Sequence, residues 1–151
     1  MGSDPGGFPT KCRKVAATLL LRIASVLALV HSILHTIGSV LSQPEPGTQA
    51  ATMEIMRAST FPSMGMTRSY ADFYLGLGLF VTVALAIEGI LFWQLATLIK
   101  SEGVRLRPML ASFTFGYVCY TIIAFSYFFA APGIFELLIA ACVAGAIAKS
   151  K

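Results

Sequence analysis

The spacing of the charged residues constrains the fold of this chain more than any other feature. Between Val15 and Ala148, long apolar segments alternate with short segments that hold most of the cations. Hydrophobic residues make up 56% of the 151 positions and charged residues 12%, whereas soluble domains contain about 25% charged residues. A water-soluble domain of this size cannot bury so much apolar surface. The pattern therefore predicts an integral membrane protein that is surrounded by the lipid bilayer.

Four apolar segments are long enough, or nearly long enough, to cross the hydrocarbon core as helices, which takes about 20 residues. The helices predicted from them cover residues 15–41, 73–99, 109–131 and 133–148. Pro108 is expected to set the first turn of the third helix, and Pro132 with Gly133 to separate the last two helices. The expected fold class is all-α: a four-transmembrane-helix bundle forming one domain over residues 15–148, with a long loop over 42–72.

The Lys and Arg residues are divided unequally between the two ends of these helices. Only Arg57 and Arg68 fall at one end, and the other nine of the 11 fall at the opposite end. The nine are Lys11, Arg13, Lys14, Arg22, Lys100, Arg105, Arg107, Lys149 and Lys151. Because basic residues of membrane proteins collect on the cytoplasmic side, we expect both termini to be cytoplasmic, in a bacterial inner membrane. Residues 1–14 are then a disordered basic tail and 149–151 a short second tail.

The loop over residues 42–72 is the outer loop in this arrangement. Its middle part, from Thr48 to Ser59, is predicted to form a short helix that lies at the membrane interface. Met53 and Met56 of this helix then turn toward lipid.

The residue distribution argues against several functional classes. The formal net charge is +4, but the cations are split among short segments and form no basic face, so no nucleic acid is expected as a partner. Cys12, Cys119 and Cys142 are isolated and form no CxxC motif, which argues against thiol-redox and zinc-ribbon chemistry. The first apolar run, of about 27 residues, is longer than the about 7–15 residues of a signal-peptide core. No cofactor is expected.

The two histidines lie in the first predicted helix. His31 and His35 are four residues apart, which places them on one helix face. Two such imidazoles can bind a metal from one side, but a metal site needs at least one further ligand, so no metal is expected. The same pair can act as a proton acceptor and its relay, or each histidine can simply hydrogen-bond to a neighbouring helix.

Asp72 and Glu136 stand near the starts of the second and fourth predicted helices. Either can be a capping residue, because a helix N-terminus favours an acidic group. Both also match His35 in depth. A hydrogen bond between His35 and Asp72 would fix the histidine tautomer, and we expect these two side chains to be neighbours.

Arg22 and Glu88 are charged residues inside predicted spans, where ionisable groups are costly and indicate functional sites. Arg22 is the cation nearest to Glu88 in depth, so a structural contact between them is one interpretation. The alternatives are a proton- or cation-coupling site at Glu88, and a neutral Glu88 that hydrogen-bonds to a neighbouring helix.

Seven polar or ionisable residues fall in the outer half of the predicted bundle, where residues from all four helices can converge. They are His31, His35, Arg68, Asp72, Tyr74, Tyr127 and Glu136. We expect this group to bind a small lipophilic molecule. In an extended form of this hypothesis, the group also acts on that molecule. The alternative is a structural or accessory subunit of a larger membrane complex, or a homo-oligomer, in which polar residues only join helices. A proton-coupled small transporter is the third hypothesis.

Three stretches in the first half of the chain form a recognisable pattern: His35-Thr-Ile-Gly38, Met56-Arg57, and Arg68-Ser-Tyr-Ala-Asp-Phe-Tyr-Leu-Gly-Leu-Gly-Leu-Phe. In this pattern the chain resembles an uncharacterised family of small bacterial four-helix integral membrane proteins. The resemblance covers most of the first two helices and the outer loop. It implies the four-helix topology and carries no activity to transfer.

Overall fold

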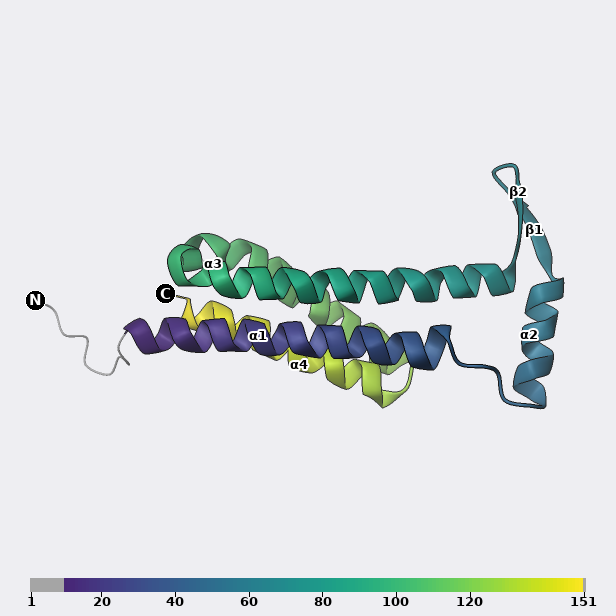
Figure 1. Cartoon of the computed structure of the whole chain (residues 1–151), viewed down its shortest axis with the longest axis horizontal. Helices are drawn as coiled ribbons and strands as arrows, with labels where there is room; N and C mark the ends of the chain where they lie inside the picture. Colours follow the sequence, from purple (N-terminus) through teal and green to yellow (C-terminus); the bar gives the residue numbers. More distant parts are fainter. Residues whose placement is uncertain (1–9, 151) are drawn as a thin grey trace, which may run out of the picture. The chain divides into compact units, whose positions relative to one another are not determined.

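A computed structural model describes residues 10–150 of the chain (Figure 1). Its elements are α1 (Thr10–His35), the π-helical turn η1 (Thr36–Val40), α2 (Thr48–Ala58), β1 (Thr60–Ser63), β2 (Met66–Ser69), α3 (Tyr70–Tyr127) and α4 (Ala130–Lys149). The protein is therefore almost entirely helical, as predicted, apart from one short hairpin. Among the described residues, three helices are long and apolar enough to cross a membrane: Cys12–Val40, Tyr70–Tyr127 and Ala130–Lys149.

The chain forms two compact units. The first holds the residues up to His31 together with those from Ala86 onward, and the second is Ser32–Leu85. Both α1 and α3 contribute residues to each unit. Each unit has its own packing contacts, and the candidate site lies within the first.

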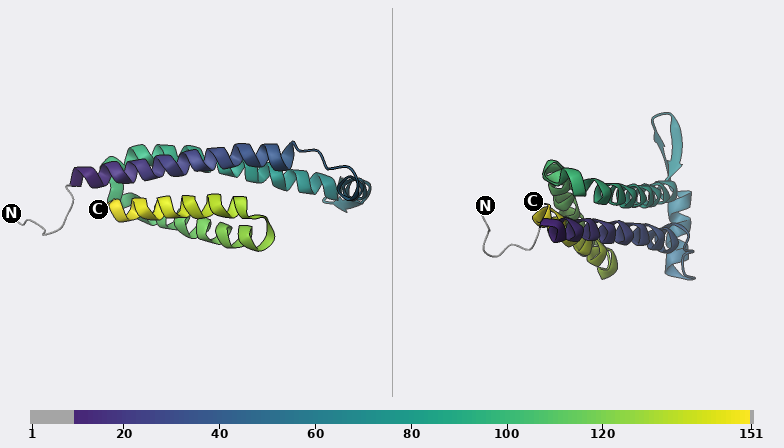
Figure 2. Two further views of the ribbon diagram at one scale, coloured as in Figure 1. Left: turned by 90° about the horizontal axis from the view of Figure 1, so that it is seen from below. Right: turned by 60° about the vertical axis from the view of Figure 1, so that its left-hand side comes forward.

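In the first unit, α3 turns back on itself at Glu102, whose backbone is not helical (φ −111°, ψ 22°). Figure 1 shows the fold-back beside the label α3, and Figure 2 shows it from two further directions. Its two arms, residues 86–101 and 103–127, run antiparallel (Figure 1). They are packed together, since the centre of the Phe92 ring lies 5.1 Å from that of Phe113 and 5.7 Å from that of Tyr117. Gly103 follows the break, and a Cβ at that position would lie 2.9 Å from the carbonyl oxygen of Ser150. The turn therefore packs against the end of α4.

The break at Glu102 lies between the second and third predicted helices, in the segment 100–108, but the role predicted for Pro108 is not observed. Pro108 lies inside α3 rather than in its first turn, so the helix continues through a residue that lacks an N–H donor. The short polar segment around Glu102 and Gly103 reverses the chain instead. At the next connection, α4 begins at Ala130 rather than at residue 133. Pro132 then falls in the first turn of α4, where a missing N–H leaves no helical bond unmade.

The beginning of the chain also differs from the prediction in part. Because α1 begins at Thr10, residues 10–14 are helical and do not belong to a disordered tail. Residues 1–9 of that predicted tail, and Lys151 of the second tail, lie outside the described residues.

A stripe of mostly small residues on α1 forms the centre of the first unit. Ala17, Leu21, Ala24 and Ala28 are all fully buried, and their spacing of three and four places them on one helix face. They pack with larger residues of the other helices: Phe92, Leu95 and Ile99 from α3, and Ile139 and Val143 from α4.

At Gly89, α1 approaches the first arm of α3 closely. The Ser25 hydroxyl donates a hydrogen bond of 2.6 Å to the Gly89 carbonyl. A Cβ at Gly89 would lie 2.7 Å from Cγ of Leu29. Glycine and serine allow this contact in the same way as in other membrane-helix interfaces.

The second unit contains the connection from α1 to α3. It confirms the helix predicted at Thr48 to Ser59, which is α2. In the views of Figures 1 and 2, α2 runs across the direction in which α3 starts. A short antiparallel hairpin follows, in which Thr60 pairs with Ser69 and Ser63 with Met66.

The hairpin was not predicted from the sequence. Its turn places Met64 (φ 48°) and Gly65 (φ 80°) in the left-handed region, which is the geometry of a type I′ turn. Asparagine or aspartate before glycine is the usual sequence signal for that turn, and methionine does not give it. Pro62 in β1 also weakens a strand prediction.

Candidate functional site

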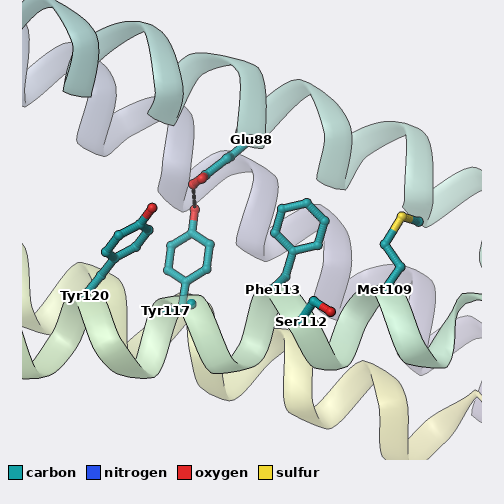
Figure 3. A pocket seen from close by; sticks show the side chains of 7 residues that line it. Glu88, Met109, Ser112, Phe113, Tyr117 and Tyr120 are labelled. Carbon is teal, nitrogen blue, oxygen red and sulfur yellow. Dashed lines mark hydrogen bonds between the residues drawn. The ribbon is translucent and has the colours of Figure 1, made fainter.

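The candidate site lies between the two arms of α3 and centres on Glu88 (Figure 3). Glu88 extends from the first arm, and the Tyr117 hydroxyl from the second arm donates a hydrogen bond to its Oε2. Tyr117 is only 1% exposed and its ring packs against Phe92. The antiparallel pairing that joins Phe92 to Phe113 thus brings Glu88 opposite Tyr117, one turn further from the break at Glu102.

A cleft of about 320 Å³ opens beside this hydrogen bond. Its lining residues are Glu88, Met109, Ser112, Phe113, Gly116, Tyr117 and Tyr120. All belong to α3, and Figure 3 shows Tyr120, Tyr117, Phe113 and Met109 pointing from the second arm toward the first arm, which carries Glu88. The walls are mainly aromatic and apolar, and the polar groups that can orient a bound molecule are the Glu88 carboxyl and the hydroxyls of Ser112, Tyr117 and Tyr120.

A second polar contact in the same unit joins α1 to α4. Nδ1 of His31 lies 3.2 Å from Oε1 of Glu136, and the two residues are 7% and 6% exposed. The Phe135 ring stacks on the imidazole at 5.0 Å. The distance is that of an ion pair, but the angles are not those of a hydrogen bond. Within residues 10–150, Nδ1 of His31 and Oε2 of Glu136 are buried without a hydrogen-bond partner.

Glu136 also acts on the cleft residues. Its carboxyl is near enough to interact electrostatically with Glu88, Tyr117 and Tyr120. The first unit therefore contains one extended polar group: a histidine and an acid from α1 and α4, next to an acid and two tyrosines from α3. These residues can hold protons, and no Lys or Arg lines the cleft beside them.

The expected contact between Arg22 and Glu88 does not form. The Arg22 guanidinium lies 4.8 Å from the centre of the Trp93 ring, a cation–π arrangement. Glu88 instead accepts from Tyr117. Arg22 is exposed on α1 and its side chain lies over the Trp93 ring. The hydrogen bond to the Glu88 carboxyl comes from the second arm of α3 instead.

Asp72 has the capping role that was the alternative to a pairing with His35. Its Oδ2 accepts from the Ser69 backbone N–H at 2.9 Å, and the Ser69 hydroxyl accepts from the Asp72 N–H at 3.1 Å. This reciprocal pair is a capping box, which satisfies two N–H groups at the start of α3. His35 contacts Thr82 of α3, with Nδ1 3.1 Å from Oγ1. The predicted hydrogen bond between His35 and Asp72 is therefore replaced by these two separate contacts.

Of the seven residues predicted for one outer site, the structure brings together His31 and Glu136. Tyr74 and Tyr127 are 56% and 81% exposed. Arg68 is exposed and donates to the Thr67 carbonyl. These three side chains therefore do not line the cleft found in the first unit.

Sequence reasoning identified Glu88 but missed its partners. Phe113, Tyr117 and Tyr120 are spaced by four and three residues, so they share one helix face. That spacing was a usable signal. The sequence did not reveal where α3 turns back. The position of that turn determines that this face meets Glu88.

Metal ligation has no geometric basis in the part of the chain that the structure describes. No three His, Cys, Asp or Glu side chains between residues 10 and 150 gather at metal-binding distance. No protein-family model, curated protein or solved structure matches this chain. The function of this protein is therefore inferred from the geometry of the site.

Proposed function

We propose that this chain is an integral membrane protein that binds a small lipophilic molecule in the cleft between the two arms of α3. The hydrogen bond between Tyr117 and Glu88, at the wall of an apolar cleft, is the observation that carries the proposal. Ionisable groups are costly inside a membrane and are retained where they have a function. The cleft volume of about 320 Å³ falls at the small end of the range for ligand sites, about 300–1,000 Å³.

The proposal includes a membrane topology. The break at Glu102 divides the whole of α3 into residues 70–101 and 103–127, and each of these parts is longer than the about 20 residues that a span needs. With α1 and α4 the two parts make four spans, with both termini cytoplasmic and residues 42–72 outside. The unequal distribution of Lys and Arg supports this orientation and a bacterial inner membrane. The resemblance to small bacterial four-helix membrane proteins implies the same topology.

An accessory subunit, or a homo-oligomer, is the second candidate. The observation that favours it is a run of highly exposed aromatic residues at the end of α3 and in the connection to α4: Phe125, Tyr127, Phe128 and Phe129. Such side chains contact either lipid or another membrane helix. In this case the polar residues serve helix packing and the cleft binds nothing.

Gly116 provides a direct test of the binding proposal. It lines the cleft, and a Cβ built there meets no atom within 4 Å. Gly116→Leu is therefore expected to fill the cleft without disturbing the backbone. The matched control is Gly76→Leu, because Gly76 also lies in α3 with no atom near its Cβ but does not line the cleft.

The measurement is ligand-induced thermal stabilisation of the purified protein against a panel of neutral, anionic and cationic lipophilic compounds. We expect at least one compound to stabilise the wild type and Gly76→Leu but not Gly116→Leu. If no compound stabilises the wild type, or if Gly116→Leu responds equally, the proposal is overturned. Native mass spectrometry that shows a stoichiometric partner chain would then favour the accessory subunit.

A further inference from the structure

We propose that the molecule bound in this cleft is a lipophilic monocation, and that its positive charge replaces a proton on Glu88. The inference rests on the proposed binding function and adds to it the chemical class of the ligand. It also adds a proton exchange that accompanies binding.

The first reason is that Glu88 has no counter-ion among residues 10–150. The ion pairs among the described residues are His31–Glu136, Arg57–Glu54 and Arg105–Glu102. Arg22 is placed over Trp93. A carboxylate in an apolar setting needs a positive charge or a proton, and the hydrogen bond from Tyr117 is not a charge. A bound cation can supply that charge in place of a proton.

The second reason is the sign of the neighbouring charges. Glu88 faces Tyr117 and Tyr120 of the second arm and interacts electrostatically with Glu136 of α4. From α1, His31 lies against Glu136. A His–Glu pair that holds one proton has zero net charge whichever residue carries it, so this pair cannot neutralise Glu88. No Lys or Arg lines the cleft, so an anionic ligand would find no positive charge there, whereas a cation would find the Glu88 carboxyl.

The third reason is the aromatic lining. Phe113, Tyr117 and Tyr120 present rings to the cleft, and aromatic faces attract cations that have lost their water shell. Met109 adds a polarisable thioether to the wall. A small quaternary ammonium ion with an apolar substituent satisfies the carboxylate and the rings together. A metal ion is not favoured, because the cleft offers one carboxylate and no cluster of ligands.

Charge balance then defines the binding reaction. The empty cleft holds a protonated Glu88 carboxyl. The cation enters, the O–H bond of the carboxyl breaks, the electron pair stays on oxygen, and the proton leaves to water. One proton is released for each cation bound. By linkage, the cation affinity rises by up to about tenfold for each pH unit while the free carboxyl is protonated.

The test uses the full chain in nanodiscs of zwitterionic lipid, so that the lipid contributes no net charge. The probes are benzyltrimethylammonium and its neutral carbon isostere, neopentylbenzene. Titration calorimetry in buffers of different ionisation enthalpy gives both the affinity and the number of protons released. For the wild type we expect cation binding with release of one proton, affinity that rises with pH, and weaker binding of the isostere.

Three variants isolate the carboxylate. Glu88→Gln keeps the shape and an oxygen that accepts from Tyr117, and it is expected to weaken cation binding by tenfold or more, with no proton release. Glu88→Asp is expected to restore proton release at reduced affinity, which separates the charge from folding effects. Glu102→Gln is the matched control, because it removes an exposed acid of the same helix outside the cleft, and its binding should equal that of the wild type.

The outcomes separate this inference from the function on which it rests. Equal binding of both probes, without proton release and with loss in Gly116→Leu, would overturn the cation assignment and leave the binding function standing. Cation binding that survives Glu88→Gln would also overturn the assignment. No binding of either probe, or binding that Gly116→Leu does not reduce, would remove the basis for both.

Discussion

Burial separates the roles of the two acidic residues that stand near helix starts. Asp72 is exposed and caps α3 through Ser69. Glu136 is buried on the face of α4 that includes Ile139 and Val143. The sequence allowed a capping role for both. The difference arises because α4 begins at Ala130, which moves Glu136 into the second turn and beyond the N–H groups that a cap can reach.

Removing one partner of the His31–Glu136 contact should cost more than removing both. Glu136→Leu leaves the imidazole buried with no polar neighbour at Nδ1, and breaking a buried pair in this way costs about 3–5 kcal/mol. The double variant, with leucine at both positions, should recover most of that loss because two apolar groups pack without a polar requirement. Thermal unfolding in detergent measures the difference. A double variant no more stable than Glu136→Leu would show that the two residues are not coupled.

Tyr117→Phe tests the hydrogen bond to Glu88 by itself. The ring stays packed against Phe92, so the change is limited to one buried hydroxyl. We expect the free energy of unfolding to fall by about 1–2 kcal/mol, the usual cost of an unsatisfied buried partner. Tyr120→Phe is the comparison, since its hydroxyl has no hydrogen bond within residues 10–150, and its stability should be unchanged. Equal losses in both variants would contradict the assignment.

At the scale of the elements, the sequence predicted which segments are helical better than where they end. Apolar length is visible in a sequence, and the helix at Thr48 to Ser59 was found in the loop. The position of a reversal depends on competition among local interrupters. Pro108 is the stronger interrupter in isolation, yet the chain turns at Glu102. Gly103 is the residue that can pack against the Ser150 carbonyl there.

Gly89→Ala should weaken the contact between α1 and the first arm of α3. The new Cβ would lie 2.7 Å from Cγ of Leu29 and 3.2 Å from the Ser25 carbonyl oxygen, so the helices must separate. We expect a loss of about 1–3 kcal/mol, as for other overpacked positions. Gly76→Ala meets no atom within 4 Å and should be neutral or more stable by up to about 1 kcal/mol. Thermal unfolding of the pair checks both signs, and a stabilised Gly89→Ala would refute the close approach.

For the whole molecule, composition was enough to predict a helical protein with membrane-length helices, and it was not enough to find the site. Depth along a helix follows from residue number, so His31, Glu88 and Glu136 were all identified as unusual. Which residues meet depends on helix rotation, and the sequence contains no measure of it. His31 therefore lies against Glu136, and Glu88 faces tyrosine rather than Arg22.

The proposed topology predicts which engineered cysteines are accessible in intact cells. In a background with Cys12, Cys119 and Cys142 changed to alanine, Ser63→Cys in β1 should react with a membrane-impermeant maleimide. Ser101→Cys, next to the break in α3, should react only after permeabilisation. Both serines are exposed side chains, so the difference reports sidedness rather than burial. The reverse pattern would invert the orientation, and equal labelling of both would contradict a four-span arrangement.

Every residue that lines the cleft lies between Glu88 and Tyr120, within α3. The site is thus encoded by one uninterrupted stretch of chain, and its walls are complete as soon as the two arms pair. The helices α1 and α4 contribute no side chain to the cleft wall. A substitution in α1 or α4 can therefore change the charge around the cleft without changing the residues that line it.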